Sequence, residues 1–201
     1  MKKQSEIIKS LTAQELAFHV YSTQFVLLTI SILLGIFLFD SVREVFELFR
    51  WNTRFVLLGI TMGSVVVLLD IGLMKLLPEK YYDDGGINEK IFKNRTILEI
   101  LFFAITIAIC EELLFRGIIQ THTNWIVGSI IFALIHIRYW GHWYLIVNIL
   151  LLSLLISGLY EWTDQSLLAV MFMHFIIDFL LGIVVRENAK KALKEGMNHE
   201  N

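Results

Sequence analysis

The chain has 201 residues, of which 56% are hydrophobic, 18% are charged and only one is proline. This composition excludes an ordinary soluble domain, and a formal net charge of −2 gives none of the basic excess typical of nucleic-acid-binding proteins. Apolar runs close to the length of helix that crosses a bilayer core, about 20 residues, recur along the chain. We therefore predict an all-α, polytopic membrane protein whose partners include the lipid bilayer and exclude nucleic acid.

The predicted elements start with an amphipathic helix over residues 1–20, which would lie along the membrane surface. About six transmembrane helices should follow, within a single domain over residues 1–201. These spans are expected at residues 21–39, 55–77, 96–120, 125–140, 142–160 and 166–185. A mixed interfacial segment separates the first two spans, and a polar connection over residues 78–95 separates the second from the third.

Lysine and arginine lie mainly on one side of the predicted spans. The N-terminal segment, the 78–95 connection and the C-terminal tail carry most of them, whereas the opposite side holds only Arg43, Arg50 and Arg54. Because basic segments tend to stay on the cytoplasmic side of a membrane, both termini should be cytoplasmic. We expect an integral membrane protein, and the sequence makes no prediction of its oligomeric state.

The third predicted span carries three charged residues, Glu111, Glu112 and Arg116, within the apolar run ITIAICEELLFRGIIQ. A charge inside a bilayer costs several kcal/mol unless it is paired or hydrated, so such residues indicate a functional site. Residues four apart share one face of a helix, so Glu112 should contact Arg116 while Glu111 points elsewhere. Glu111 would then be available as a general base. The alternative is a buried Glu112–Arg116 ion pair that only fixes helix packing.

Two further residues in the apolar spans have a structural and a functional interpretation. Cys110 is the only cysteine, so an internal disulfide is excluded. Because a thiolate is disfavoured beside two carboxylates, we predict that Cys110 is a small apolar packing residue and not a nucleophile. Asp70, in the second span, would be a proton or ion site or a structural group satisfied near Lys75, and we favour the structural role.

The fourth and sixth predicted spans each contain a pair of unusual residues four positions apart. Phe132 and His136 form the first pair, and His174 and Asp178 form the second. A lone histidine in a helix is most often a hydrogen-bonded core residue. Here, however, ionisable side chains occur on three apolar spans, and the partners most readily available to them are one another. The sequence therefore predicts that the three spans converge on one polar site.

These residues resemble the three-motif signature of the CPBP family of intramembrane proteases (CAAX protease and bacteriocin-processing, or Abi), which includes the eukaryotic type II CAAX prenyl endopeptidase Rce1. The motifs follow the family's order, as Glu111-Glu112-x-x-x-Arg116, Phe132-x-x-x-His136 and His174-x-x-x-Asp178. The resemblance covers residues 96–185, which would form the catalytic core. The third motif usually ends in Asn or Asp in this family, and Asp178 falls within that pattern.

The resemblance implies a hydrolytic role for the matched residues. Glu111 and His136 would bind and activate a water that attacks a peptide carbonyl. His174 and Asp178 would help to stabilise the resulting oxyanion or position the site. Arg116 would orient the two neighbouring glutamates of the first motif.

The resemblance leaves the role of a metal open, since the family has been described both as metalloproteases and as metal-free glutamic proteases. Glu111, His136 and His174 would form a three-ligand set with an open fourth position for a zinc-bound water. The helical His-Glu-x-x-His motif of many zinc proteases is absent from the sequence. Zinc is therefore an alternative, and no other cofactor is expected.

Simple counting places two of the site residues at different depths. At 1.5 Å per residue from the cytoplasmic face, Glu111 would lie about 20 Å deep and His136 about 6 Å deep. For the two to meet, the third span must start deeper or the turn after His136 must be sunk into the membrane. We therefore expect a water-filled cavity that opens to the cytoplasmic side. Its expected lining is Glu111, Glu112, His136 and His174, with Arg138 or His142 near the mouth.

The resulting hypothesis is an intramembrane endopeptidase that cleaves a membrane-associated peptide or protein. For a compact chain with short loops, the resemblance implies a prokaryotic member of the family in a bacterial cell membrane. Its substrate would be a pheromone or bacteriocin precursor, or a prenylated C-terminus if the host makes one. The alternatives are a non-proteolytic scaffold or bacteriocin-immunity protein of the same fold, and a small ion or proton transporter that uses the same buried groups.

Overall fold

A computed structural model of the chain describes residues 10–199, and within that range all regular secondary structure is helical. In chain order the helices are α2 (Ala13–Leu38), α3 (Val42–Leu48), α4 (Thr53–Leu76), η1 (Glu79–Tyr81), α5 (Ile87–Phe92), α6 (Ile97–Glu112), η2 (Leu113–Gln120), α7 (Trp125–Ile135), η3 (Ile137–Tyr139), α8 (Trp143–Trp162) and α9 (Leu167–His199). The predicted all-α class is confirmed.

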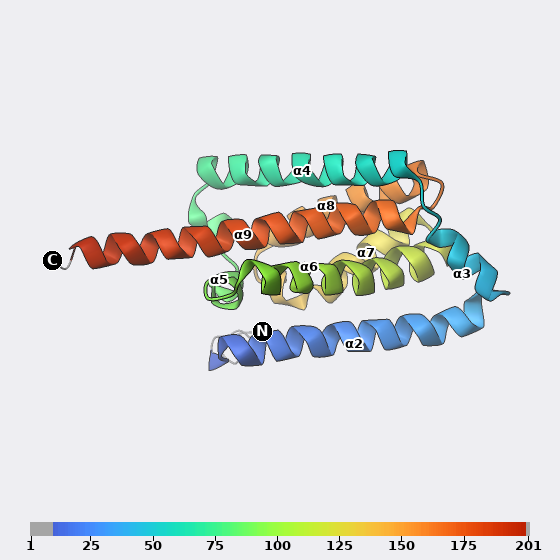
Figure 1. Ribbon diagram of the computed structural model, residues 1–201, viewed down its shortest axis with the longest axis horizontal. Helices are drawn as coiled ribbons and strands as arrows, with labels where there is room; N and C mark the ends of the chain where they lie inside the picture. Colours follow the sequence, from blue (N-terminus) through green and yellow to red (C-terminus); the bar gives the residue numbers. More distant parts are fainter. Residues whose placement is uncertain (1–9, 200–201) are drawn as a thin grey trace.

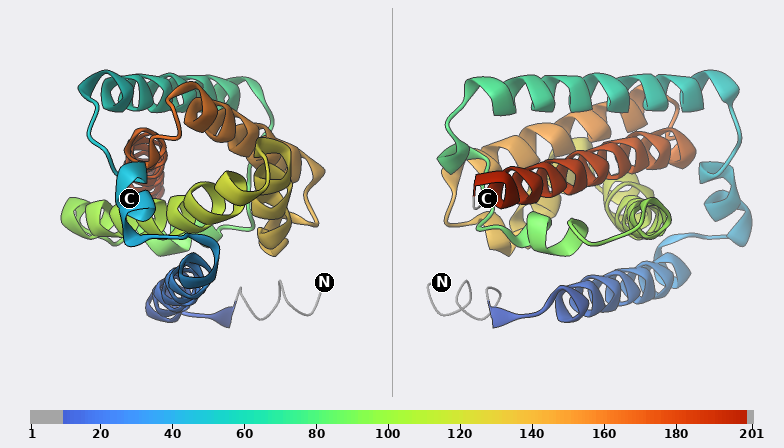
Figure 2. Two further views of the ribbon diagram at one scale, coloured as in Figure 1. Left: turned by 90° about the vertical axis from the view of Figure 1, so that its right-hand side faces the viewer. Right: turned by 60° about the vertical axis from the view of Figure 1, so that its left-hand side comes forward.

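Helix α9 is the central element of the bundle. It runs between α4 and α6, contacts α5 and α8, and extends past the other helices at its C-terminal end (Figure 1). Helix α2 lies along the opposite side of α6, where it also contacts η2 and α5. The two further views show α7 and α8 next to each other, and α8 also contacts α9 (Figure 2).

Four of the described helices are long and apolar enough to cross a membrane: α2, α4, α8 and α9 as far as Leu193. The predicted third span is divided between α6, with 16 residues, and the π-helix η2, with eight. The predicted fourth span is shorter than expected, because α7 has 11 residues and ends before His136. The molecule is an integral membrane protein by these helices, but the count of about six spans is not confirmed.

The first predicted span starts earlier than expected. Residues 1–9 of the predicted amphipathic helix lie outside the described residues, and residues 13–20 form the first turns of α2. Thr12 and Glu15 make a reciprocal capping box that fixes the helix start. No glycine or proline occurs between that cap and Gly35, so nothing breaks the helix near residue 20.

The 78–95 connection is more ordered than its polar sequence indicates. It contains η1 and α5, and α5 packs against α9. The carboxylate of Asp84 accepts hydrogen bonds from the backbone N–H groups of Ile87 and Asn88 at the start of α5. The Asp83 carboxylate likewise accepts from the N–H groups of Gly85 and Gly86. These local hydrogen bonds therefore fix the turn that leads into α5.

Close packing of α4 on α9 depends on two glycines that are four residues apart. A Cβ atom on Gly59 would lie 2.1 Å from the carbonyl oxygen of Ala169, and one on Gly63 would lie 2.7 Å from that of Met173. Small residues with this spacing let two helix backbones approach closely in a membrane. The contact fixes the part of α9 that leads directly into His174.

Replacing Gly59 with alanine should destabilise the protein by about 1–3 kcal/mol, because the added methyl group meets a backbone oxygen and the helices must move apart. Thermal unfolding of the purified protein in detergent would measure the effect. Gly72→Ala is the matched control on the same helix, since no atom lies within 4 Å of a Cβ placed there. Equal melting temperatures for both variants would show that the close contact of α4 with α9 does not stabilise the fold.

Candidate active site

A cavity of about 1010 Å³ lies inside the bundle and is walled by residues of α2, α4, α5, α6, α7, α8 and α9. Four of the six predicted site residues line it: Glu111, His136, His174 and Asp178. The three spans that carry the motifs therefore converge on one space, as predicted. One detail of the expected lining is wrong, because Glu112 does not line the cavity. Of the two residues expected near the mouth, His142 is not part of the lining. The side chain of Arg138 lies outside the described part of the structure.

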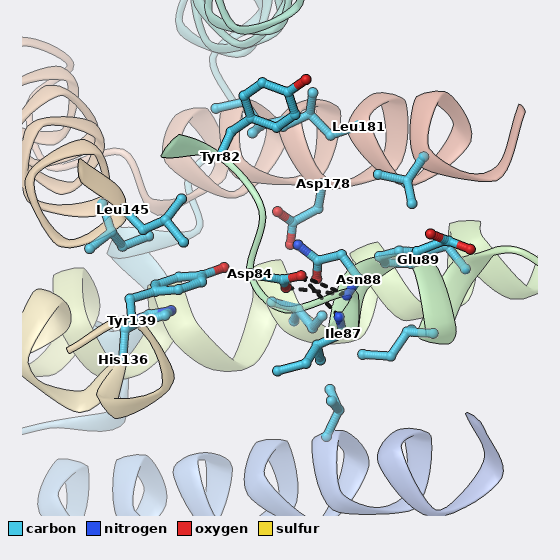
Figure 3. A pocket seen from close by; sticks show the side chains of 18 of the residues that line it. Tyr82, Asp84, Ile87, Asn88, Glu89, His136, Tyr139, Leu145, Asp178 and Leu181 are labelled. Carbon is cyan, nitrogen blue, oxygen red and sulfur yellow. Dashed lines mark hydrogen bonds between the residues drawn. The ribbon is translucent and has the colours of Figure 1, made fainter. Parts of the chain in front are cut away.

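The outer part of the cavity is bounded by the 78–95 connection, the start of α2 and the C-terminal half of α9. Figure 3 shows Asp178 projecting from α9 toward the segment that holds Asp84 and Asn88. His136 and Tyr139 come from the other side of the cavity. Their rings are stacked with an interplanar angle of 6° and centroids 6.0 Å apart.

Glu111 is 8% exposed and lies one residue before the end of α6. Its Oε1 accepts a hydrogen bond from the side-chain amide of Gln24, with Nε2 and Oε1 3.1 Å apart. Gln24 comes from α2, is 4% exposed and lines the same cavity. The sequence analysis missed this residue, although an amide in the middle of an apolar span was a signal that could have identified it.

Glu112 points away from the cavity into a fully buried ion pair. Its Oε1 lies 3.2 Å from Nη1 of Arg116, and both side chains have 0% exposure. The guanidinium also donates to the hydroxyl and carbonyl oxygens of Ser153 on α8, and it lies over the ring of Phe132 at 4.7 Å. The i,i+4 spacing therefore pairs these two residues and leaves Glu111 on another face, as the helical periodicity predicts.

His174 connects the buried ion pair to the cavity. Its Nδ1 lies 2.6 Å from the same Oε1 of Glu112, and its Nε2 lies 3.4 Å from Oδ2 of Asp178. Carboxylate oxygens accept hydrogen bonds, so both ring nitrogens can donate at once only when the ring carries two protons. A doubly protonated ring would be held from both sides by these carboxylates in the wall of the cavity.

His136 is brought to the level of Glu111 by the shortness of α7. Both residues can be counted from the turn at 121–124: Glu111 precedes it by about ten residues and His136 follows it by about twelve, or roughly 15 to 18 Å each. Counted from this shared turn, Glu111 and His136 lie at similar depths, because α7 ends at Ile135 and does not continue to the opposite end of the bundle. The Nδ1 of His136 lies 2.8 Å from the carbonyl oxygen of Phe132, which can only accept. In the neutral ring the lone pair is therefore on Nε2.

The helix changes its geometry directly after the two glutamates. The π-helix η2 begins at Leu113. At its end, the carbonyl oxygen of Arg116 accepts from both the backbone N–H and the hydroxyl of Thr121, the latter at 2.9 Å. Short π-helical segments inside α-helices are frequent at functional sites. Here the segment carries Arg116, the partner of Glu112.

The residues as placed do not fit a zinc ion. Within residues 10–199, no three His, Cys, Asp or Glu side chains are arranged to hold a metal. Both ring nitrogens of His174 face carboxylates, which leaves neither directed at a shared metal position with Glu111 and His136.

Of the two residues with structural interpretations, Cys110 is buried as predicted, whereas Asp70 lies at the cavity with a different partner from the one expected. Cys110 is buried and does not line the cavity. Asp70 lines the cavity and hydrogen-bonds the side chain of Asn148, so its polar partner comes from α8. The expected partner Lys75 is on the same helix and is not the one observed.

Comparisons with known proteins agree with the motif pattern. A family described as type II CAAX prenyl endopeptidase Rce1-like matches residues 93–180. A Bacillus subtilis (strain 168) protein described as uncharacterized protein YpbD is 40% identical over 167 residues, which are 82% of this chain and 87% of that protein. No solved structure matches the chain.

Proposed function

The chain belongs to the Rce1-like family of type II CAAX prenyl endopeptidases, and on this premise we propose that it is an intramembrane endopeptidase. We propose further that a water activated by Glu111 and His136 hydrolyses a peptide bond inside the cavity. The observation that carries the proposal is the convergence of Glu111, His136 and His174 on one cavity of about 1010 Å³. That volume accommodates an extended peptide segment.

The proposed reaction has two steps. The water oxygen attacks the peptide carbonyl carbon while one water proton moves to the Glu111 carboxylate and the other is held by Nε2 of His136. The negative charge that develops on the carbonyl oxygen is stabilised through space by the positive charge of the protonated His174 ring, whose N–H groups stay with Glu112 and Asp178. Glu111 then passes its proton to the leaving nitrogen as the carbon–nitrogen bond breaks, which regenerates the carboxylate and releases an acid and an amine.

The buried groups behind the cavity have a positioning role in this proposal. Glu112 holds Nδ1 of His174, and Arg116 neutralises Glu112. Asp178 holds the other ring nitrogen. His174 is thereby kept charged and oriented before substrate arrives, so that no reorganisation is needed when the oxyanion forms.

We also propose that the cavity opens to the cytoplasm of a bacterial cell. The start of α2, α5 and the end of α9 lie together at one end of the bundle (Figure 1). That end carries Lys75, Lys80, Lys90, Arg95 and Arg186, and basic residues favour the cytoplasmic side. The similarity to a Bacillus subtilis protein supports a bacterial membrane.

The direct test uses purified protein in phospholipid vesicles and two sets of internally quenched peptides. One set ends in a farnesylated cysteine followed by three residues, and the other carries an unprenylated apolar segment. Cleavage of either set supports an endopeptidase and identifies the substrate class. A folded protein that cleaves neither set would contradict the proposal and favour the scaffold or immunity function. Cleavage that survives a zinc chelator supports the metal-free reaction, whereas loss with the chelator and recovery with zinc would overturn it.

Replacing His136 with alanine should lower kcat by about 100-fold or more, because the attacking water loses the acceptor for its second proton. The matched control is His142→Ala, since that histidine lies just before α8 and does not line the cavity. Initial rates on the cleaved peptide would measure both. Equal activity in the two variants would remove His136 from the mechanism.

A further inference from the structure

We infer that Gln24 is a positioning residue of this active site, contributed by a helix outside the region that matches the protease family. The inference rests on the proposed function, because it concerns how Glu111 is held. Gln24 lies on α2, whereas the family match covers residues 93–180. The site would therefore be incomplete without α2.

The contact with Glu111 fixes the orientation of the Gln24 amide. An ionised carboxylate only accepts hydrogen bonds, so the amide nitrogen of Gln24 must face Glu111. The hydrogen bond from Nε2 is the one contact of this kind that Glu111 receives from the described residues. Without it, the glutamate side chain could rotate about its own torsions, and its reach toward a bound water would no longer be fixed.

Placing Gln24 at this position does not favour the stability of the fold. With its nitrogen toward Glu111, Gln24 leaves its Oε1 atom buried, and that oxygen has no hydrogen-bond partner among the residues described. A buried acceptor without a partner destabilises the folded state, whereas an apolar side chain of the same length would fill the space without that cost. Gln24 is therefore better explained by what it does to Glu111 than by packing.

Helix α2 packs beside the helix that carries Glu111. It contacts α6, η2 and α5, and Leu16, Val20 and Leu27 from it line the cavity together with Gln24. The position of Gln24 is thus set directly against the helix that carries Glu111. The same helix is continuous over 26 residues, so Gln24 lies within regular helix and not at a helix end.

The test compares Gln24→Met with Ser31→Ala in the vesicle assay. Methionine preserves length and removes both polar atoms, so we expect kcat to fall about 10- to 100-fold while KM stays within about twofold. The melting temperature of Gln24→Met should equal or exceed that of the unmodified protein, since the unpartnered oxygen is gone. Ser31 is a buried polar residue of the same helix, and it does not line the cavity. Its hydroxyl donates to the backbone carbonyl oxygen of Leu27, one turn earlier in α2. Its replacement should leave kcat unchanged.

A second variant, Gln24→Glu, keeps the shape but puts an acceptor where the donor was. It should lose kcat at least as strongly as Gln24→Met, because two carboxylates repel each other at this distance. Full activity in both variants would overturn the inference while Glu111→Gln still tests the proposed function separately. A lower melting temperature for Gln24→Met with unchanged kcat would also overturn it, by showing that the residue only supports the fold. Loss of activity in Ser31→Ala as well would assign the effect to α2 packing and count against it.

Discussion

Replacing Glu111 with glutamine should abolish peptide cleavage, with a fall in kcat of about 100- to 10,000-fold. Glutamine has the same shape but takes no proton from water, so the substitution removes the chemistry and keeps the volume. It also places two amides, at positions 24 and 111, side by side, and one of these can still donate to the other. The protein should therefore fold normally, with unchanged helix content and a melting temperature close to that of the unmodified chain.

Glu89→Gln is the matched control for this result, because Glu89 also lines the cavity but lies on α5 near its outer part. Its activity should stay within about twofold of the unmodified protein, since no reacting group depends on it. Cleavage by Glu111→Gln at a rate comparable to that of Glu89→Gln would remove the general base from the account. Neither variant should change the amount of protein inserted in the membrane.

The second large effect is expected at Arg116. Arg116→Met should destabilise the protein by about 3–5 kcal/mol, because Glu112 and Asp178 must then share the single positive charge of His174, which leaves one negative charge in the cluster uncompensated. Both side chains have 0% exposure, so water cannot replace the lost partner. The free energy of unfolding in a detergent titration would measure the loss. Arg43→Met is the control, since Arg43 and Glu47 form an ion pair at the surface whose side chains are 87% and 60% exposed, and such pairs contribute little.

A double variant separates the two interpretations of the buried pair. Glu112→Leu combined with Arg116→Met removes both charges and should recover much of the lost stability, because an apolar pair of similar volume often replaces a buried ion pair without cost. If the pair positions His174, the double variant will be folded and inactive. A folded double variant with normal kcat would show that the pair only fixes helix packing. Stability that is not recovered would point instead to the hydrogen bonds of Arg116 with Ser153.

Helical periodicity was sufficient to predict the arrangement around the two glutamates. Four-residue spacing gave the pairing of Glu112 with Arg116 and the contact of His174 with Asp178, because both follow from local geometry that the chain cannot avoid in a helix. The family predicted from the three motifs is confirmed by the comparisons. The expected lining by Glu112 failed for the same geometric reason, since a residue paired with Arg116 cannot also face the cavity.

Other features depend on contacts between distant segments. The hydrogen bond from Gln24 to Glu111 joins residues far apart in sequence, so no periodicity within one helix could indicate it. The division of the third span by η2 and the early end of α7 are local departures from regular helix within apolar sequence, where hydropathy does not change. The early end of α7 is nevertheless what brings His136 to the level of Glu111.

The central claim is that water attacks the peptide directly in the cavity, with Glu111 as base and without a covalent enzyme intermediate. Mass spectrometry of single-turnover cleavage, in water enriched in the heavy oxygen isotope, tests it most directly. The account predicts one heavy oxygen in the new carboxylate of the product and no mass added to the protein at any time during the reaction. A transient adduct of the protein with the acyl fragment, at Cys110 or elsewhere, would contradict the account.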